Sequence, residues 1–222
     1  MLNHNPRIVT NGLVLCLDAA NPKSYSGSGT NWKDLSGNGN YGTLINGVGY
    51  SADNKGTMVF DGVNDFVLTD FFPSESILGN KFTWSFWAKY TRFANNIGSH
   101  GNSTEPRFYT QLTSTNGRLR TAIGDTFYDS ATLGTENLNK WLMISFVYNE
   151  GIVKTYVNAN LKDERSGVSF IGTSSSPWTV GSGFNNSRFF EGQSSNHIIY
   201  NRALSEAEIR QNYNALRGRY GL

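Results

Sequence analysis

Carboxylate and amide side chains next to glycine are the first residues of this sequence whose spacing indicates chemistry. Residues 34–38 read DLSGN, and residues 61–65 read DGVND. Ca²⁺ takes about six to eight oxygen ligands, carbonyl oxygens included, so both segments are candidate parts of a calcium site. The candidate ligands are Asp34, Asn38, Asp61 and Asp65, with Asp18 as a weaker addition. Asp and Asn beside glycine also bond their own backbone in turns, and that explanation stays open.

Sugar recognition needs an exposed aromatic ring beside polar groups, because a sugar ring has an apolar face rimmed by hydroxyl groups. In the hairpin expected over residues 108–123, period-two alternation places Tyr109 and Gln111 on one face. The candidate ligand-binding residues are Tyr109, Gln111, Arg118, Arg120 and Trp178. Further loop aromatics, some of them expected in the core, are Trp32, Tyr50, Phe93 and Phe184. An ordinary solvated sheet face would show the same alternation, so both interpretations stay open.

No catalytic residues are expected. Glycoside hydrolysis needs two carboxylates about 5 to 10 Å apart, and the sequence has no Glu-x-Asp-x-Glu motif to supply them. The close pair Glu206 and Glu208 begins a predicted helix, where capping explains it. Three histidines and one cysteine form no zinc-binding or nucleophile motif. A carboxylate pair assembled from distant strands stays open.

The composition indicates short strands joined by many turns. Asn, Gly, Ser and Thr make up 91 of the 222 residues, and only 16% of the chain is charged. Such a balance argues against a helical bundle, while the aromatic content of 14% argues against disorder. The sequence therefore predicts an all-β protein, a two-sheet antiparallel sandwich of the jelly-roll type with one C-terminal helix.

Strict alternation over residues 82–90 (FTWSFWAKY) predicts a half-buried strand. Turn-forming residues at 114–117, 149–151 and 158–160 predict hairpins between neighbouring strands. Ser205 and Glu208 form a capping box that begins an amphipathic helix over residues 206–216, and Gly218 is placed to end it. We expect an N-terminal arm, residues 1–12, that frays unless it is bound, and a single domain over residues 13–222.

Charge and hydropathy exclude two classes of partner. A formal net charge of +2 without a Lys/Arg run predicts no nucleic-acid binding. Membrane insertion is not expected, because no apolar stretch approaches the roughly 18 residues that a membrane span needs. Cys16 has no partner cysteine and is expected to be a buried, small apolar residue.

Five segments, in order along the chain, carry a resemblance to a known family. They are residues 12–22 (GLVLCLDAANP), 32–40 (WKDLSGNGN), 59–67 (VFDGVNDFV), 82–87 (FTWSFW) and 199–213 (IYNRALSEAEIRQNY). In these segments the chain resembles the laminin-G-like, or concanavalin A-like lectin/glucanase, jelly rolls in the version found in bacteriophage structural proteins. The resemblance implies two stacked antiparallel sheets, often a calcium ion at the rim and, in some members, a sugar or protein ligand.

The resemblance further implies a non-enzymatic protein of the phage virion surface, a capsid decoration or tail or fibre-associated module with affinity for surface glycans. Its expected partners are other virion proteins, a host glycan and further copies of itself in a homo-oligomer. We expect the domain to be the whole gene product, with the arm as its anchor on the particle. A dedicated carbohydrate-binding lectin is the first alternative, and a glycan hydrolase is the second.

Overall fold

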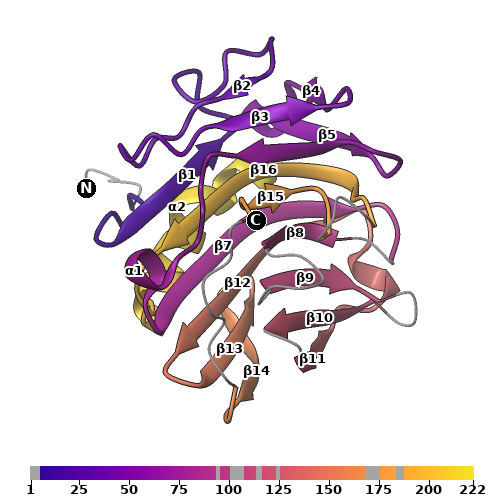
Figure 1. Cartoon of the computed structure of the whole chain (residues 1–222). Helices are drawn as coiled ribbons and strands as arrows, with labels where there is room; N and C mark the ends of the chain where they lie inside the picture. The colour runs from indigo at the N-terminus through magenta and orange to yellow at the C-terminus, as the bar shows by residue number, and fades with distance from the viewer. Residues whose placement is uncertain are drawn as a thin grey trace, which may run out of the picture.

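The computed structural model shows two stacked antiparallel sheets with one longer helix near the C-terminal end (Figure 1). It describes residues 6–93, 96–100, 108–113, 117–123, 126–168, 176–183 and 188–222. The predicted fold class, an antiparallel two-sheet sandwich with a C-terminal helix, is confirmed.

Within the described ranges, each sheet contains eight strands. Sheet 1 runs, in spatial order, β14 (Asn160–Arg165), β13 (Ile152–Val157), β12 (Trp141–Asn149), β7 (Lys81–Tyr90), β16 (Glu191–Tyr200), β5 (Thr57–Asp61) and β4 (Gly49–Ser51), and β1 (Leu13–Asp18) also pairs with β16. Sheet 2 runs β11 (Thr126–Thr132), β10 (Arg118–Ile123), β9 (Phe108–Leu112), β8 (Asn96–His100), β15 (Thr179–Val180), β6 (Phe66–Thr69), β3 (Gly42–Ile45) and β2 (Asn31–Trp32). The short helices are α1 (Glu75–Leu78), η1 (Asp53–Lys55) and η2 (Thr135–Asn137), and the chain closes with α2 (Glu206–Leu216) and η3 (Arg217–Tyr220).

Aromatic side chains of β7 form the centre of the core between the sheets. Trp84 is fully buried, with its ring centroid 4.8 Å from that of Trp178 and 5.7 Å from that of Phe108. Large apolar side chains contribute most of the area removed from water, so this cluster supplies much of the stabilisation of the sandwich. Phe82, Trp84, Phe86 and Ala88, which share one face of β7, all lie in this core.

The opposite face of β7 is buried as well. Trp87 is 1% exposed and stacks on Tyr220 of η3, with ring centroids 4.2 Å apart. Tyr213 of α2 stacks on the same ring at 5.7 Å. The prediction of a half-buried strand is therefore wrong, because α2 and η3 cover the outer face of sheet 1. The predicted packing of the C-terminal helix on the sandwich is confirmed.

The predicted capping box begins α2. The Ser205 hydroxyl accepts from the Glu208 backbone N–H at 3.3 Å, and the Glu208 carboxylate accepts from the Ser205 N–H at 2.9 Å. The Arg202 guanidinium at 2.6 Å, more than the cap itself, lowers the pKa of Glu208 to about 2. Gly218 does not end the helix, because the chain tightens into η3 and turns left-handed only at Gly221 (φ 72°).

The described part of the N-terminal arm, residues 6–12, lies against α2 and β16. The Val9 N–H donates to the Asn212 side-chain oxygen at 2.8 Å, and the Tyr200 hydroxyl donates to the Val9 carbonyl at 2.9 Å. Val9 is only 7% exposed. An arm frays unless something binds it, and this segment is bound by its own domain.

Candidate functional site

A polar patch lies on the outer face of sheet 2, where β9, β10 and β11 pair side by side. Arg120 of β10 stands opposite Gln111 of β9 and Asp129 of β11. Residues directly opposite in an antiparallel pair share a face. Leu112 and Leu119, the next residues along these strands, are buried in the core, so Gln111 and Arg120 face away from it.

Asp129 holds two arginine side chains of this patch in place. Its carboxylate accepts from Arg120 Nε at 2.6 Å and Nη2 at 3.1 Å, a bidentate pair, and from Arg118 Nη1 at 3.2 Å. The hydrogen bond from Arg120 is the largest of the effects that lower the pKa of Asp129. A planar guanidinium that pairs with a carboxylate in this way keeps a fixed orientation.

Two further arginines complete the patch from other parts of the chain. Arg188 Nη1 donates to the Gln111 side-chain oxygen at 3.0 Å. Arg165 of β14 pairs with Asp163 at 2.9 Å and reaches the backbone carbonyl of Asp129 at 3.4 Å. We call this set the arginine patch: Gln111, Arg118, Arg120, Asp129, Asp163, Arg165 and Arg188. Four arginines and two aspartates leave a surplus of positive charge, which favours anionic or hydroxyl-rich ligands.

The sequence predicts three members of the arginine patch and misses the others. Gln111, Arg118 and Arg120 come together as the alternation indicates. Arg165 and Arg188 lie far away in sequence, and only the pairing of the strands and the path of the segment before β16 bring them here. Period-two alternation along β11 was the available signal for Asp129.

The aromatic candidates have mixed outcomes. Trp178 is wrong as a ligand-binding residue, because it is 1% exposed and packs on Trp84 in the core. Trp32 is likewise fully buried, and Phe93 is half-buried against the core. Tyr50 is 36% exposed but packs on Tyr25. The Tyr109 side chain and all of Phe184 lie outside the described residues.

The first candidate calcium segment is built as a turn. The Asp34 carboxylate accepts from the backbone N–H groups of Cys16 and Ser36 at 2.8 Å each and from that of Asn40 at 3.1 Å. It also accepts from the Ser36 hydroxyl at 2.6 Å. Asn38 directs its amide nitrogen to the carbonyls of β1. Donors surround this carboxylate, so the site does not fit a cation, and the turn explanation accounts for these residues.

The second candidate segment is also closed by internal hydrogen bonds. Asp61 accepts from the Val63 N–H at 2.8 Å, and Asp65 accepts from the Asp61 N–H at 3.2 Å. Burial raises the pKa of Asp65, although the hydrogen bond from the Asp61 backbone partly offsets this. Within the part of the chain that the structure describes, no group of three or more His, Cys, Asp or Glu residues gathers in metal-binding geometry. Internal turn hydrogen bonds therefore account for this segment, and calcium binding by Asp61 and Asp65 stays a prediction. Asp18, the weaker candidate, instead pairs with Arg219 at 2.7 Å.

A serine–histidine pair resembles a nucleophile and its base but lies in the core. Ser194 Oγ is 2.7 Å from His197 Nε2, and both residues are fully buried. The His197 ring stacks on Phe86 and Trp84, and desolvation lowers its pKa to about 3. Without access for a substrate the pair is structural. Cys16 is buried as predicted, and burial raises the pKa of its thiol.

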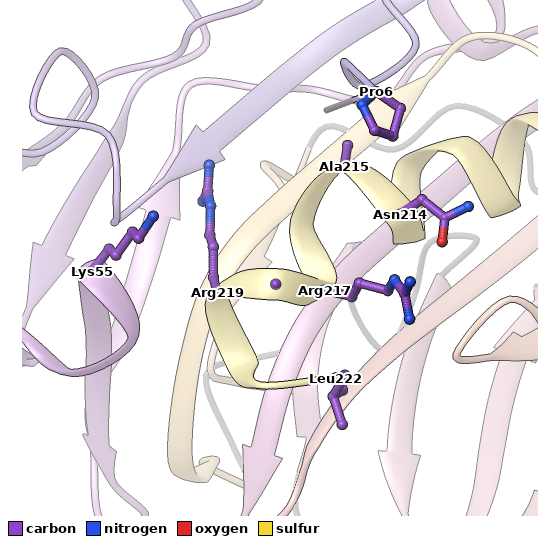
Figure 2. Close-up of a pocket in the computed structure, with 8 residues that line it drawn as sticks. Pro6, Lys55, Asn214, Ala215, Arg217, Arg219 and Leu222 are labelled. Carbon is purple, nitrogen blue, oxygen red and sulfur yellow. The ribbon is translucent and has the colours of Figure 1, made fainter. Parts of the chain in front are cut away.

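A basic cavity of about 670 Å³ lies beside η3, on the side of the molecule that α2 covers (Figure 2). Lys55, Arg217 and Arg219 line it, but Arg219 is neutralised by Asp18 through two contacts at 2.7 and 2.8 Å. Figure 2 shows Lys55 and the Arg219 side chain on one side of η3, with Arg217 extending to the other side. The cationic groups do not converge on one point, so the arginine patch is the better candidate site.

Among the described residues, no helix has both the length and the apolar character needed to cross a membrane.

Comparison with known families and structures agrees with this fold. Residues 60–210 match the family Laminin_G_3, described as the concanavalin A-like lectin/glucanases superfamily. A comparison with curated proteins found no match.

Solved structures with similar folds include the binding domain of paraclostridial mosquitocidal protein 1, with a TM-score of 0.72 and 21% identity over 93% of this chain and 52% of that one. Domain 4 of the arabinanase AbnA from Geobacillus stearothermophilus, in complex with arabinotriose, has a TM-score of 0.70 and 17% identity over 91% of this chain and 98% of that domain. The binding domain of botulinum neurotoxin DC in complex with SialylT has a TM-score of 0.71 and 15% identity, covering 93% and 52%. The chain thus spans about half the length of the toxin binding domains that it matches.

Proposed function

Because the chain belongs to the Laminin_G_3 family, whose superfamily name covers both lectins and glucanases, we propose that it is a non-enzymatic carbohydrate-binding module displayed on a phage particle. The observation that carries the carbohydrate part is the arginine patch on sheet 2. Its arginine side chains are solvent-facing, with Arg118, Arg120 and Arg165 exposed by 49%, 36% and 50%.

The patch has the chemistry of a surface that binds acidic glycans. Arginine forks donate in a plane to carboxylates and hydroxyl groups, and Gln111 adds an amide. The surplus of positive charge adds attraction for uronic or sialic acid groups. Two of the similar structures, the arabinanase domain with arabinotriose and the neurotoxin domain with SialylT, hold saccharides, which supports the proposal by analogy of fold.

Binding without hydrolysis is the better description of this face. Asp129 accepts from Arg118 and Arg120, and its lowered pKa keeps it ionised, so it is a poor general acid. The second carboxylate of the patch, Asp163, is paired with Arg165. Both carboxylates therefore orient arginines.

The display on a virion rests on the resemblance of the sequence to phage structural domains. In this setting the outer face of sheet 2 would point away from the particle. The partners that we propose are capsid or tail proteins and a host surface glycan, with copies of the chain forming a homo-oligomer. Immunogold labelling of purified particles tests this part, and label that stays with the free protein fraction would contradict it.

A glycan array containing acidic and neutral saccharides tests the carbohydrate part. We expect saturable binding to acidic glycans, and a loss of at least tenfold in the double variant Arg118→Gln/Arg120→Gln. The matched control Arg92→Gln/Arg210→Gln removes two exposed cations elsewhere and should bind as the parent does. Silence of the parent protein on every glycan, or equal loss in the control, would overturn the proposal.

A further inference from the structure

A second group of exposed side chains lies on sheet 2, at the end away from the arginine patch. Exposure alternates from residue to residue along β3, β6 and the residues that directly flank them. Tyr41, Leu68 and Phe72 are exposed by 43%, 38% and 48%, and Asp70 is exposed between the last two. The residues between them, Gly42, Thr69 and Phe71, are buried. Alternation of this kind places all four exposed side chains on the outer face of the sheet.

The strand register brings these residues together. Gly42 pairs with Thr69, and the Asp70 N–H donates to the Tyr41 carbonyl at 2.8 Å, so Tyr41 stands opposite Asp70. Leu68 and Phe72 flank Asp70 along the chain, and Leu68 is a diagonal neighbour of Tyr41, about 7 Å away in such a ladder. We call Tyr41, Leu68, Asp70 and Phe72 the aromatic row.

The layer beneath the aromatic row is rigid. The backbone N–H of Trp178 donates to the Phe71 carbonyl at 2.8 Å, and the Thr69 hydroxyl donates to the Trp178 carbonyl at 2.7 Å. The buried Phe71 and Trp178 rings pack on each other with centroids 6.5 Å apart. The exposed rings are therefore carried on a fixed base, which lowers the entropy cost of binding.

Resting on the proposed carbohydrate binding, we propose that the aromatic row is a second saccharide subsite, one that takes neutral sugar residues. A sugar ring would stack its apolar face on Tyr41 and Phe72, while Asp70 accepts from hydroxyl groups. Thr43, which pairs with Leu68, and Asn31, which pairs with Thr43, add exposed polar groups beside it.

The position of Asp70 favours a neutral sugar over a protein or an acidic sugar. Cores of protein interfaces are depleted of charged residues, whereas here a carboxylate lies among the exposed apolar side chains. The same carboxylate repels the acidic groups that the arginine patch attracts. From β6 to β10 there are four strand spacings, roughly 19 Å, so one polysaccharide chain that reaches both subsites would gain avidity.

Affinity electrophoresis in gels containing dextran, arabinan or alginate tests the subsite. We expect Tyr41→Ala/Phe72→Ala to weaken retardation by a neutral polysaccharide about tenfold, and Phe72→Trp to preserve it. Tyr50→Ala, which truncates another exposed tyrosine, is the matched control and should leave retardation unchanged. Thermal unfolding of each variant checks that the fold is intact.

The outcomes separate this inference from the proposed function. Parent protein that is retarded by none of the polysaccharides contradicts both. Retardation that falls in Arg118→Gln/Arg120→Gln but not in Tyr41→Ala/Phe72→Ala overturns the second subsite alone. If Tyr41→Ala/Phe72→Ala loses binding to purified phage particles while its retardation by glycans is unchanged, the aromatic row binds protein. This result also overturns the inference.

Discussion

Arg120 is the residue on which recognition by the arginine patch most depends, because both nitrogens of its fork contact Asp129. Arg120→Lys keeps the charge but loses this geometry, since an ammonium group has no planar fork. We expect glycan affinity to fall about tenfold, while the free energy of unfolding changes by less than about 1 kcal/mol, because the pair is partly exposed. Titration calorimetry measures the first quantity and urea unfolding the second. Undiminished affinity would mean that charge alone binds the glycan.

His197 makes stability depend on pH. Its pKa is about 3 in the folded protein and about 6.5 when unfolded, so only the unfolded chain takes up its proton as the pH falls below 6.5. Stability should be level above that pH and lower by about 2 kcal/mol at pH 5. The carboxylate Glu208, with its lowered pKa, loses its contribution only below about pH 4.5. Urea unfolding between pH 5 and 7 should show this slope in the parent protein, and His197→Gln should flatten it.

Asp34 stabilises the fold through the four hydrogen bonds that its carboxylate accepts. Asp34→Ala leaves buried donors without partners and should cost about 2 to 4 kcal/mol. Since protein donors and no cation hold this carboxylate, EDTA should leave the melting temperature of the parent protein unchanged. A calcium-dependent rise in melting temperature that Asp34→Ala abolishes would restore the calcium interpretation.

At the scale of elements, α2 is the piece that closes sheet 1. Ile209, on the side of α2 that packs on sheet 1, is fully buried, whereas the neighbouring Arg210 is exposed. Ile209→Ala should lower the free energy of unfolding by about 2 to 5 kcal/mol, and Arg210→Ala by less than about 0.5 kcal/mol. Equal effects in urea unfolding would mean that the helix is not packed as described.

Elements with a strong local pattern could be predicted from the sequence. The alternation of β7, the hairpins after β12 and β13 and the capping box of α2 all come from neighbouring residues. β2 and β3 are short, and the edge strand β14 reads NLKDER, so none of them has a strong apolar alternation. These strands form because a neighbour supplies their hydrogen bonds, and a local pattern does not contain that information.

At the scale of the whole molecule, the two outer faces differ, because α2 and η3 cover that of sheet 1 and no helix of the described residues covers that of sheet 2. α2 and η3 bury the second side of sheet 1, including Trp87. The outer face of sheet 2 carries the aromatic row at one end and the strands β9 to β11 of the arginine patch at the other. Side-chain contacts bring Arg188 and, from β14 of sheet 1, Arg165 to the patch, and strand pairing places Tyr41 beside β6. That is why alternation in one hairpin could find part of the site but not its remaining members.

Binding of a glycan to the outer face of sheet 2 can be observed residue by residue in a nuclear magnetic resonance titration with the glycan that binds most tightly on the array. We expect saturable shift changes at Gln111 and at the side-chain Nε–H groups of Arg118 and Arg120, while signals of α2 stay unchanged. Shift changes confined to α2 and η3, or none at saturating glycan, would contradict it.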